Sequence, residues 1–255
     1  MPFFEHQGLQ LFYLDAPATG KDLHEPILLI HGFASNHAVN WVNTLWVKTL
    51  TEAGRRVIAI DNRGHGQSSK PYEPGSYATL KMADDALALI DHLRLKSVDV
   101  MGYSMGARIG AFMAAAAPVR VRSLILGGLG HYLIEGGGVS LRIAEAMEAE
   151  TFQELSEPTQ RMFRKFAEST NSDLKALAAC IRGSRQKMSL ELAAHLTMPA
   201  LVAIGSTDMV AGDGAKLVAV LPHGTLLTIP ERDHNMAVGD KVYRAGVLEF
   251  LSARA

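Results

Sequence analysis

The chain has 255 residues, of which 48% are hydrophobic and 20% are charged, and this composition excludes wholesale disorder. Its 25 Lys and Arg residues against 26 Asp and Glu residues give a formal net charge of −1, which removes the usual electrostatic case for a nucleic-acid-binding protein. The single cysteine, Cys180, excludes an internal disulfide, and no second thiol supports a zinc or redox motif.

No segment carries the pattern of a targeting signal or a membrane span. Residues 1–10 contain Glu5 and no apolar run, so we do not expect a secretory signal. The longest apolar stretch, 109–118, is interrupted by Gly110 and is shorter than the about 20 residues that cross a bilayer. We therefore expect a cytoplasmic protein that binds neither membrane nor nucleic acid.

Short runs of β-branched and aliphatic residues recur with helical segments between them, which favours an α/β fold with a mostly parallel sheet covered on both faces. The first strand should be antiparallel and at an edge, because too few residues precede the second for a helical crossover. The predicted strands are 9–14, 27–31, 56–60, 97–103, 123–127, 200–205 and 225–229, and the predicted helices are 41–53, 77–93, 105–117 and 240–251.

The helix over 77–93 has a clear apolar stripe with helical spacing. The stripe is formed by Leu80, Ala83, Leu87, Ile90 and Leu93. It places Asp84 and Asp85 away from the core, where we expect both to be solvated.

Residues 131–198 contain no convincing strand, although a short crossover would be enough there. Ser156, Ser172 and Ser189 each precede a helical pattern, and the glycines 136–138 could form a hinge at the entrance. We predict that 131–198 is a helical cap, or lid, inserted between the two parts of a core formed by 1–130 and 199–255.

A nucleophile motif follows the strand predicted at 97–103. The sequence Gly102-Tyr103-Ser104-Met105-Gly106 is G-x-S-x-G between a strand and a helix, which is the context that the motif requires. The glycines allow a tight turn that exposes the Ser104 hydroxyl beside a helix N-terminus, where free N–H groups supply positive potential. Ser104 is therefore the predicted nucleophile.

A serine hydroxyl needs a general base, and the base needs an orienting acid. His234 follows the last predicted strand and Asp208 follows the strand before it. Both lie at carboxyl ends of strands, where open α/β sheets place their sites, and the order Ser, Asp, His along the chain suits the motif. Asp213 is the alternative acid.

The oxyanion of an acyl-transfer reaction needs two N–H donors. Phe33 follows the strand predicted at 27–31, and Met105 follows the nucleophile, so we assign the donors to the backbone amides of Phe33 and Met105. His31 is expected to be a structural, hydrogen-bonding histidine.

These motifs resemble the α/β-hydrolase superfamily, in its serine-nucleophile, esterase-like branch with a helical cap. The resemblance rests on 31–33, on 61–68 (D-N-R-G-H-G-Q-S), on 102–106, and on Asp208 and His234, and it covers nearly the whole chain. It implies an open eight-stranded sheet, whose further strand should lie at 2–6, and structural roles for Asp61 and Arg63. It implies no cofactor and no metal.

The resemblance favours a serine hydrolase that cleaves a small carboxylic ester through an acyl-enzyme. Carbon–carbon bond hydrolysis of ring-cleavage products, lactone hydrolysis or a non-catalytic small-molecule receptor are the alternatives, whereas Ser104 argues against relatives with an aspartate nucleophile. His131, Met209 and Met236 lie near the predicted triad or cap entrance and are candidates for substrate contact.

Overall fold

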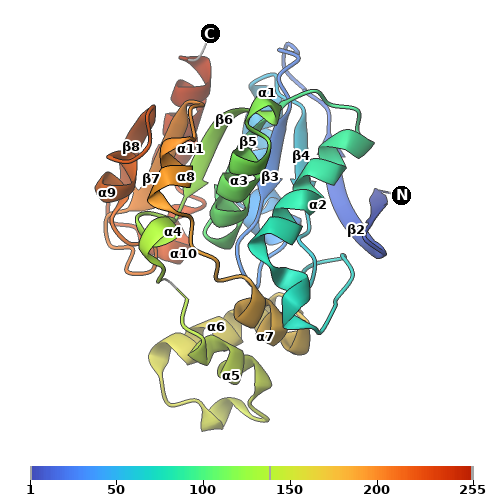
Figure 1. Ribbon diagram of the computed structural model, residues 1–255, viewed down its shortest axis with the longest axis vertical. Helices are drawn as coiled ribbons and strands as arrows, with labels where there is room; N and C mark the ends of the chain where they lie inside the picture. The colour runs from blue at the N-terminus through green and yellow to red at the C-terminus, as the bar shows by residue number, and fades with distance from the viewer. Residues whose placement is uncertain (1, 138, 254–255) are drawn as a thin grey trace.

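A single eight-stranded sheet forms the centre of the molecule. The computed structural model describes residues 2–137 and 139–253, and its strands follow the order β1-β2-β4-β3-β5-β6-β7-β8 across the sheet. Strands β3 to β8 are parallel, and β1 and β2 pair antiparallel at one side. The predicted fold class, an open and mostly parallel sheet with helices on both faces, is confirmed (Figure 1).

The strands lie close to the predicted ranges, with one correction at the edge. Their bounds are β1 Phe3–His6, β2 Leu9–Ala16, β3 Ile27–Ile30, β4 Val57–Ile60, β5 Val98–Tyr103, β6 Val121–Gly127, β7 Ala200–Gly205 and β8 Gly224–Ile229. The edge strand on the antiparallel side of the sheet is β1, which is the further strand that the resemblance implied. Strand β2 is not at the edge, because it pairs with β1 on one side and with β4 on the other.

Helices connect the parallel strands and cover both faces of the sheet (Figure 1). In the core they are α1 Trp46–Glu52, α2 Thr79–His92, α3 Met105–Ala116, α9 Gly214–Val218, α10 His234–Ala237 and α11 Lys241–Ser252, with short helical turns η1 Ala38–Val42, η2 Pro74–Tyr77 and η3 Pro118–Arg120. The helix predicted over 41–53 is in fact two pieces, because Leu45 takes a left-handed conformation (φ 67°) between η1 and α1.

The alternation of side chains along the strands divides the core into two layers. Leu28 and Ile30 of β3 pack into the layer beneath α2 and α3. Ile27 and Leu29 of the same strand pack into the opposite layer, which contains buried residues of α1 and α11. Burial on both faces explains why the central strands are continuous apolar runs.

Helix α2 is rotated relative to the stripe that the sequence suggested. Leu80 is 58% exposed, whereas Asp85 is buried and binds Arg63 with two hydrogen bonds of 2.6 and 2.7 Å. The expected solvation of Asp85 was therefore wrong, because a buried arginine from the loop after β4 compensates its charge.

Residues 131–198, which we call the cap segment, consist of helices and loops wherever the structure describes them. The helices are α4 Tyr132–Glu135, α5 Arg142–Glu148, α6 Pro158–Ser169, α7 Leu174–Gly183 and α8 Leu190–Ala194, with a turn η4 at Phe152–Glu154. Helices α5, α6 and α7 gather at one end of the sheet (Figure 1). Of the glycines predicted to form a hinge, Gly138 lies outside the described residues.

Candidate active site

Ser104 occupies a strained turn between β5 and α3. Its backbone has φ 55° and ψ −112°, a conformation that is rare for a residue with a side chain. The turn needs glycine on both sides: a Cβ on Gly106 would come within 1.9 Å of the carbonyl oxygen of Ile30, and a Cβ on Gly102 within 2.2 Å of that of Gly106. The packing of this turn therefore fixes the position of the serine.

Hydrogen bonds connect the three residues predicted as a catalytic triad. The Oγ of Ser104 lies 3.0 Å from Nε2 of His234, and Nδ1 of His234 lies 2.8 Å from Oδ2 of Asp208. His234 begins α10 after β8, and Asp208 follows β7. The carboxyl ends of three parallel strands thus bring together side chains that are as many as 130 residues apart in the chain.

Neighbouring groups hold His234 and Asp208 in place. The Tyr103 hydroxyl donates to the carbonyl oxygen of His234 over 2.6 Å. The other carboxylate oxygen of Asp208 accepts from the backbone N–H groups of Val210 and Ala211 at 2.8 and 2.9 Å. With one oxygen bound to the backbone, the second is directed at the imidazole.

The alternative acid, Asp213, has a different role in the fold. Its carboxylate accepts from the backbone N–H groups of Ala215 and Lys216, and so caps α9. The structure brings His234 together with Asp208 and not with Asp213.

The backbone amides predicted as oxyanion donors belong to residues beside Ser104. Phe33 and Met105 line the same cavity as the serine, and neither amide donates to a carbonyl or side chain of the residues that the structure describes. By contrast, the N–H of Gly32 is engaged, because it donates to Oδ1 of Asn40 over 3.1 Å. Within the described residues, the amides of Phe33 and Met105 are therefore without such a partner, as the prediction of an oxyanion role requires.

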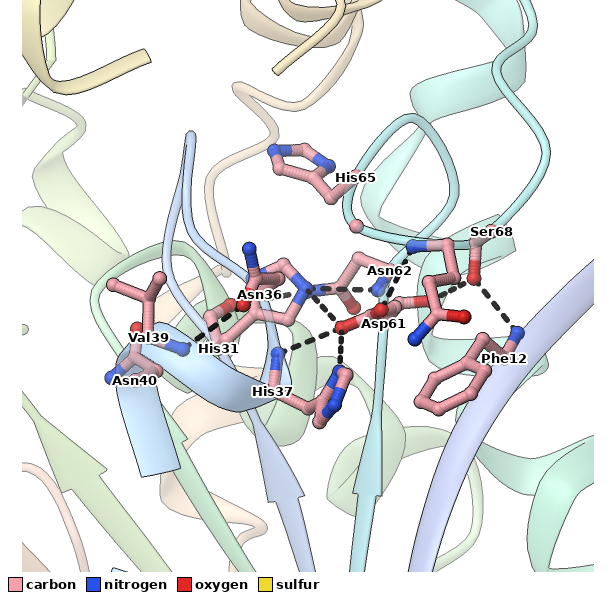
Figure 2. Close-up of polar contacts among 12 residues, drawn as sticks. Phe12, His31, Asn36, His37, Val39, Asn40, Asp61, Asn62, His65 and Ser68 are labelled. Carbon is pink, nitrogen blue, oxygen red and sulfur yellow. Dashed lines mark hydrogen bonds and ion pairs between the residues drawn. The ribbon is translucent and has the colours of Figure 1, made fainter. Parts of the chain in front are cut away.

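A polar network joins the loop after β3 to the loop after β4 (Figure 2). Oδ1 of Asp61 accepts from the backbone N–H of His37 at 2.7 Å and lies 2.9 Å from Nδ1 of the same residue. His31 donates from Nδ1 to the carbonyl oxygen of Gly32 at 2.8 Å, and its Nε2 accepts from the N–H of Asn62 at 3.0 Å. These bonds tie the ends of β3 and β4 together, in keeping with structural roles for His31 and Asp61.

Burial determines the protonation of this network. Burial lowers the pKa of the His31 imidazole, although nearby Asp61 opposes the shift, and it lowers the pKa of His65 to about 3. Burial is the largest single influence on the pKa of Asp61 and would raise it, but the hydrogen bond from His37, the charges of His31 and His37 and the N–H of Gln67 together outweigh burial, and the net shift is downward. Asp61 is therefore ionised, and His65 is neutral, at neutral pH.

Two cavities meet at Ser104. The larger, of about 400 Å³, lies between the core and residues 135–137, 139 and 181–187. The smaller, of about 200 Å³, extends toward α6 and η1. Ser104 and Phe33 line both of them, so a substrate held at the serine could extend in two directions.

The three residues predicted to contact substrate do not line either cavity. Met209 and Met236 are 90% and 59% exposed, so their side chains face solvent. His131 is engaged instead at the start of the cap segment, where its Nδ1 accepts from the N–H of Asp213 at 2.6 Å and its Nε2 lies 3.4 Å from Glu135.

Sequence reasoning missed several residues that shape the site. Asn40, Tyr103 and Arg185 reach the cavities or the triad from η1, β5 and the end of the cap segment. Among these three residues, Tyr103 alone gave a local sequence signal of a place in the site, because it lies inside the predicted nucleophile motif. Within the described ranges, no group of three or more His, Cys, Asp or Glu side chains could hold a metal ion, and no helix there is both long and apolar enough for a membrane span.

Comparisons with known proteins agree with this architecture. Residues 25–135 match the family model described as alpha/beta hydrolase fold. A hydrolase from Pseudomonas aeruginosa has a similar structure, with a TM-score of 0.79 at 24% identity, over 98% of this chain and 97% of the other. The enol-lactonase from Burkholderia xenovorans gives a TM-score of 0.75 at 19% identity, over 98% of this chain and all (100%) of the other.

Among curated proteins, the chain is similar to the dihydrolipoyllysine-residue acetyltransferase component of the acetoin cleaving system of Pseudomonas putida. The two are 34% identical over 227 residues, which is 82% of this chain and 58% of that protein. Two further relatives from Bacillus subtilis are a putative 2-succinyl-6-hydroxy-2,4-cyclohexadiene-1-carboxylate synthase and the AB hydrolase superfamily protein YisY. The match spans 37% and 36% of their lengths, so this chain matches only part of each relative. From the fold, the turn at Ser104 and these matches, the chain belongs to the α/β-hydrolase fold superfamily. This confirms the superfamily that its motifs indicated, while the serine-nucleophile, esterase-like branch stays a prediction.

Proposed function

We propose that this protein is a serine hydrolase that cleaves small carboxylic esters through an acyl-enzyme intermediate. One observation carries the proposal: Ser104, His234 and Asp208 form a continuous line of hydrogen bonds of 3.0 and 2.8 Å. This is the geometry in which a neutral imidazole can take the proton of a serine hydroxyl while a carboxylate holds its tautomer.

The reaction follows from the placement of these groups. Ser104 Oγ attacks the ester carbonyl as His234 Nε2 takes its proton, and the amides of Phe33 and Met105 stabilise the tetrahedral oxyanion. The protonated His234 then gives the proton to the departing alcohol, and the acyl-serine remains. Water activated by His234 attacks that acyl group, and the acid is released.

The names of the relatives support a hydrolytic reaction, but these relatives cleave several different kinds of bond. They include a 2-hydroxymuconate semialdehyde hydrolase, an enol-lactonase and carboxylesterases, and also a haloalkane dehalogenase and an epoxide hydrolase. We place this chain with the serine enzymes because Ser104 stands where the latter two chemistries use an aspartate. Lactone and carbon–carbon bond hydrolysis are the alternatives, since the same triad would serve them.

The test is hydrolysis of p-nitrophenyl acetate, butyrate and octanoate by wild-type protein and by Ser104→Ala. We expect turnover by the wild type and a loss of several orders of magnitude in the variant, because the hydroxyl forms the covalent intermediate. A matched control is Ser252→Ala, at an exposed serine that bonds within α11, which should keep full activity. Equal activity in Ser104→Ala would refute the mechanism.

A second readout does not depend on the choice of ester. A fluorophosphonate should label Ser104 in the wild type, as seen by intact mass and peptide mapping, and should leave Ser104→Ala unlabelled. Labelling without turnover of any ester would favour the lactone or carbon–carbon substrates. Absence of both would favour a small-molecule receptor.

A further inference from the structure

The two cavities at Ser104 differ in which half of an ester they can receive. His234 lines the smaller cavity and is not among the residues that line the larger one. In the proposed mechanism, His234 Nε2 protonates the leaving oxygen. The alcohol must therefore depart on the side of the smaller cavity, and the acyl group attached to Ser104 extends into the larger one.

The linings of the two cavities carry different charge. Among its described lining residues, the smaller cavity has no Lys, Arg, Asp or Glu. The larger cavity is lined by Arg108, Arg185 and Lys187, against a single carboxylate, Glu135. Glu135 is 62% exposed and pairs with His131 at 3.4 Å, so the wall on the acyl side is positively charged.

None of these three cations has a carboxylate within 4.0 Å among the residues that the structure describes. Arg63, which is buried elsewhere in the core, shows the usual arrangement with its ion pair to Asp85 at 2.6 Å. A cluster of cations without a carboxylate partner, beside a cavity, is a natural site for an anionic group of a ligand.

Hydrogen bonds to backbone carbonyl oxygens hold the two arginines of this cluster in place. The Arg108 guanidinium on α3 donates to the carbonyl oxygens of Tyr132 and Gln186 at 2.9 and 2.8 Å, and so attaches both ends of the cap segment to the core. Arg185 donates to the carbonyl oxygen of Val139. Burial, together with the positive charge of Arg185, lowers the pKa of Arg108 to about 10, which agrees with a local excess of positive charge.

We propose that the larger cavity binds a carboxylate at the far end of the acyl group, held by Arg185 and Lys187. The preferred substrates would then be monoesters of dicarboxylic acids rather than esters of simple fatty acids. This inference rests on the proposed function, because it uses His234 to decide which half of the ester enters which cavity.

The kinetic test compares p-nitrophenyl hydrogen adipate with its neutral methyl-capped counterpart, p-nitrophenyl methyl adipate. We expect the wild type to favour the anionic ester by about tenfold or more in kcat/KM, since a hydrogen bond to a charged group is worth about that much. In Arg185→Gln/Lys187→Gln the ratio should fall to about twofold or less. Lys216→Gln, at an exposed lysine of α9, is the control that should keep the wild-type ratio.

Two further measurements test the proposal if the double variant does not fold: the salt dependence of the wild-type ratio and the ratio of the single variant Lys187→Gln. Raising NaCl from about 0.05 M to about 0.5 M should reduce the wild-type ratio, because screening weakens exposed charges. Lys187→Gln should reduce it as well. The ammonium of Lys187 makes no hydrogen bond to another described residue, so its loss should leave the fold intact. A wild-type ratio near one would overturn the proposal.

A binding measurement separates failure of this inference from failure of the proposed function. Adipate at millimolar concentration should raise the Tm of wild type and of Ser104→Ala, while hexanoate should not, and the double variant should not respond to either. Turnover of the neutral ester without any preference or adipate response would refute the carboxylate site alone. An adipate response without Ser104-dependent turnover would refute the proposed function and keep the site.

Discussion

Replacing Asp208 by asparagine tests the triad at the residue whose role is hardest to assign from sequence. Oδ2 of Asp208 accepts from His234 Nδ1, while Oδ1 accepts from the backbone N–H groups of Val210 and Ala211. An amide has one acceptor oxygen and one donor nitrogen, so the substituted side chain can satisfy one of these sides and not both.

Each orientation of the amide has a defined consequence. If the oxygen faces the two backbone N–H groups, the amide nitrogen faces His234 and forces the proton onto Nε2, which can then no longer accept the proton of Ser104. If the oxygen faces His234, the amide nitrogen opposes two N–H donors, and the side chain loses its anchor to the backbone. The first orientation should be favoured, because the oxygen then accepts from two backbone N–H groups instead of from His234 alone. In that orientation His234 is protonated at Nε2, which is the wrong tautomer for a general base.

We therefore expect Asp208→Asn to lower kcat by about 10³- to 10⁴-fold, or about 4–5.5 kcal/mol of transition-state stabilisation. KM should change little, because the side chain does not line either cavity. The assay is steady-state hydrolysis of p-nitrophenyl butyrate, with circular dichroism to show that the variant is folded.

Asp213→Asn is the matched control. Asp213 caps α9, so its replacement should cost about 1 kcal/mol of stability or less and leave kcat within about twofold of wild type. A kcat reduced by less than about tenfold in Asp208→Asn, or an equal loss in Asp213→Asn, would refute the assignment of the acid.

Two further predictions concern buried polar groups away from the reaction. Trp46 Nε1 donates to the carbonyl oxygen of Val238 at 2.7 Å, whereas Nε1 of the equally buried Trp41 has no partner among the described residues. Trp46→Phe should therefore lower the free energy of unfolding, measured in urea, by about 1–3 kcal/mol more than Trp41→Phe does. Equal losses in the two variants would contradict this. The pKa of Asp61 is lowered in the fold from its ordinary 3.8, so its ionised form contributes stability that is present above that value and lost as the pH falls through the folded pKa. The stability difference between wild type and Asp61→Asn should thus be smaller at pH ~3 than at pH ~7, and a difference that does not change with pH would show that the charge of Asp61 is not what stabilises the loop.

The parts of the site that could be predicted from sequence are those set by local chain geometry. The motif predicts the turn at Ser104, although just one of its two glycine requirements is local: a Cβ on Gly102 would meet the carbonyl oxygen of Gly106, whereas a Cβ on Gly106 would meet that of Ile30 on β3. Asp208 and His234 could be placed because the carboxyl ends of parallel strands meet at one edge.

Predictions that depended on packing between distant segments were less accurate. The apolar stripe of α2 suggested a buried Leu80 and a solvated Asp85, and the structure reverses both. The reason is Arg63, which lies 22 residues away and pairs with Asp85 in the core. Periodicity reports the apolar face of a helix but not a buried ion pair, since the partner is on another element.

The same limit applies to Met209 and Met236. Each is close in sequence to a triad residue, yet neither side chain reaches a cavity, because neighbouring residues in a turn or at a helix start point in different directions. The acyl-side cations could not be found from sequence for a related reason. Arg108, Arg185 and Lys187 come from α3 and from the end of the cap segment, and only the tertiary fold brings them to one wall.

The cap segment also contacts residues of the candidate active site. Phe33, whose amide is a proposed oxyanion donor, packs against Phe163 of α6 with ring centroids 6.0 Å apart. The next residue, Ala34, accepts a hydrogen bond of 2.9 Å from Thr170 Oγ1 at the end of the same helix. Because α6 also lines the smaller cavity, a shift of this helix would move the proposed oxyanion donor and the wall of that cavity together. Substitutions on α6 should therefore alter kcat as well as KM, since the helix that shapes one side of the substrate also positions a group that acts in the transition state.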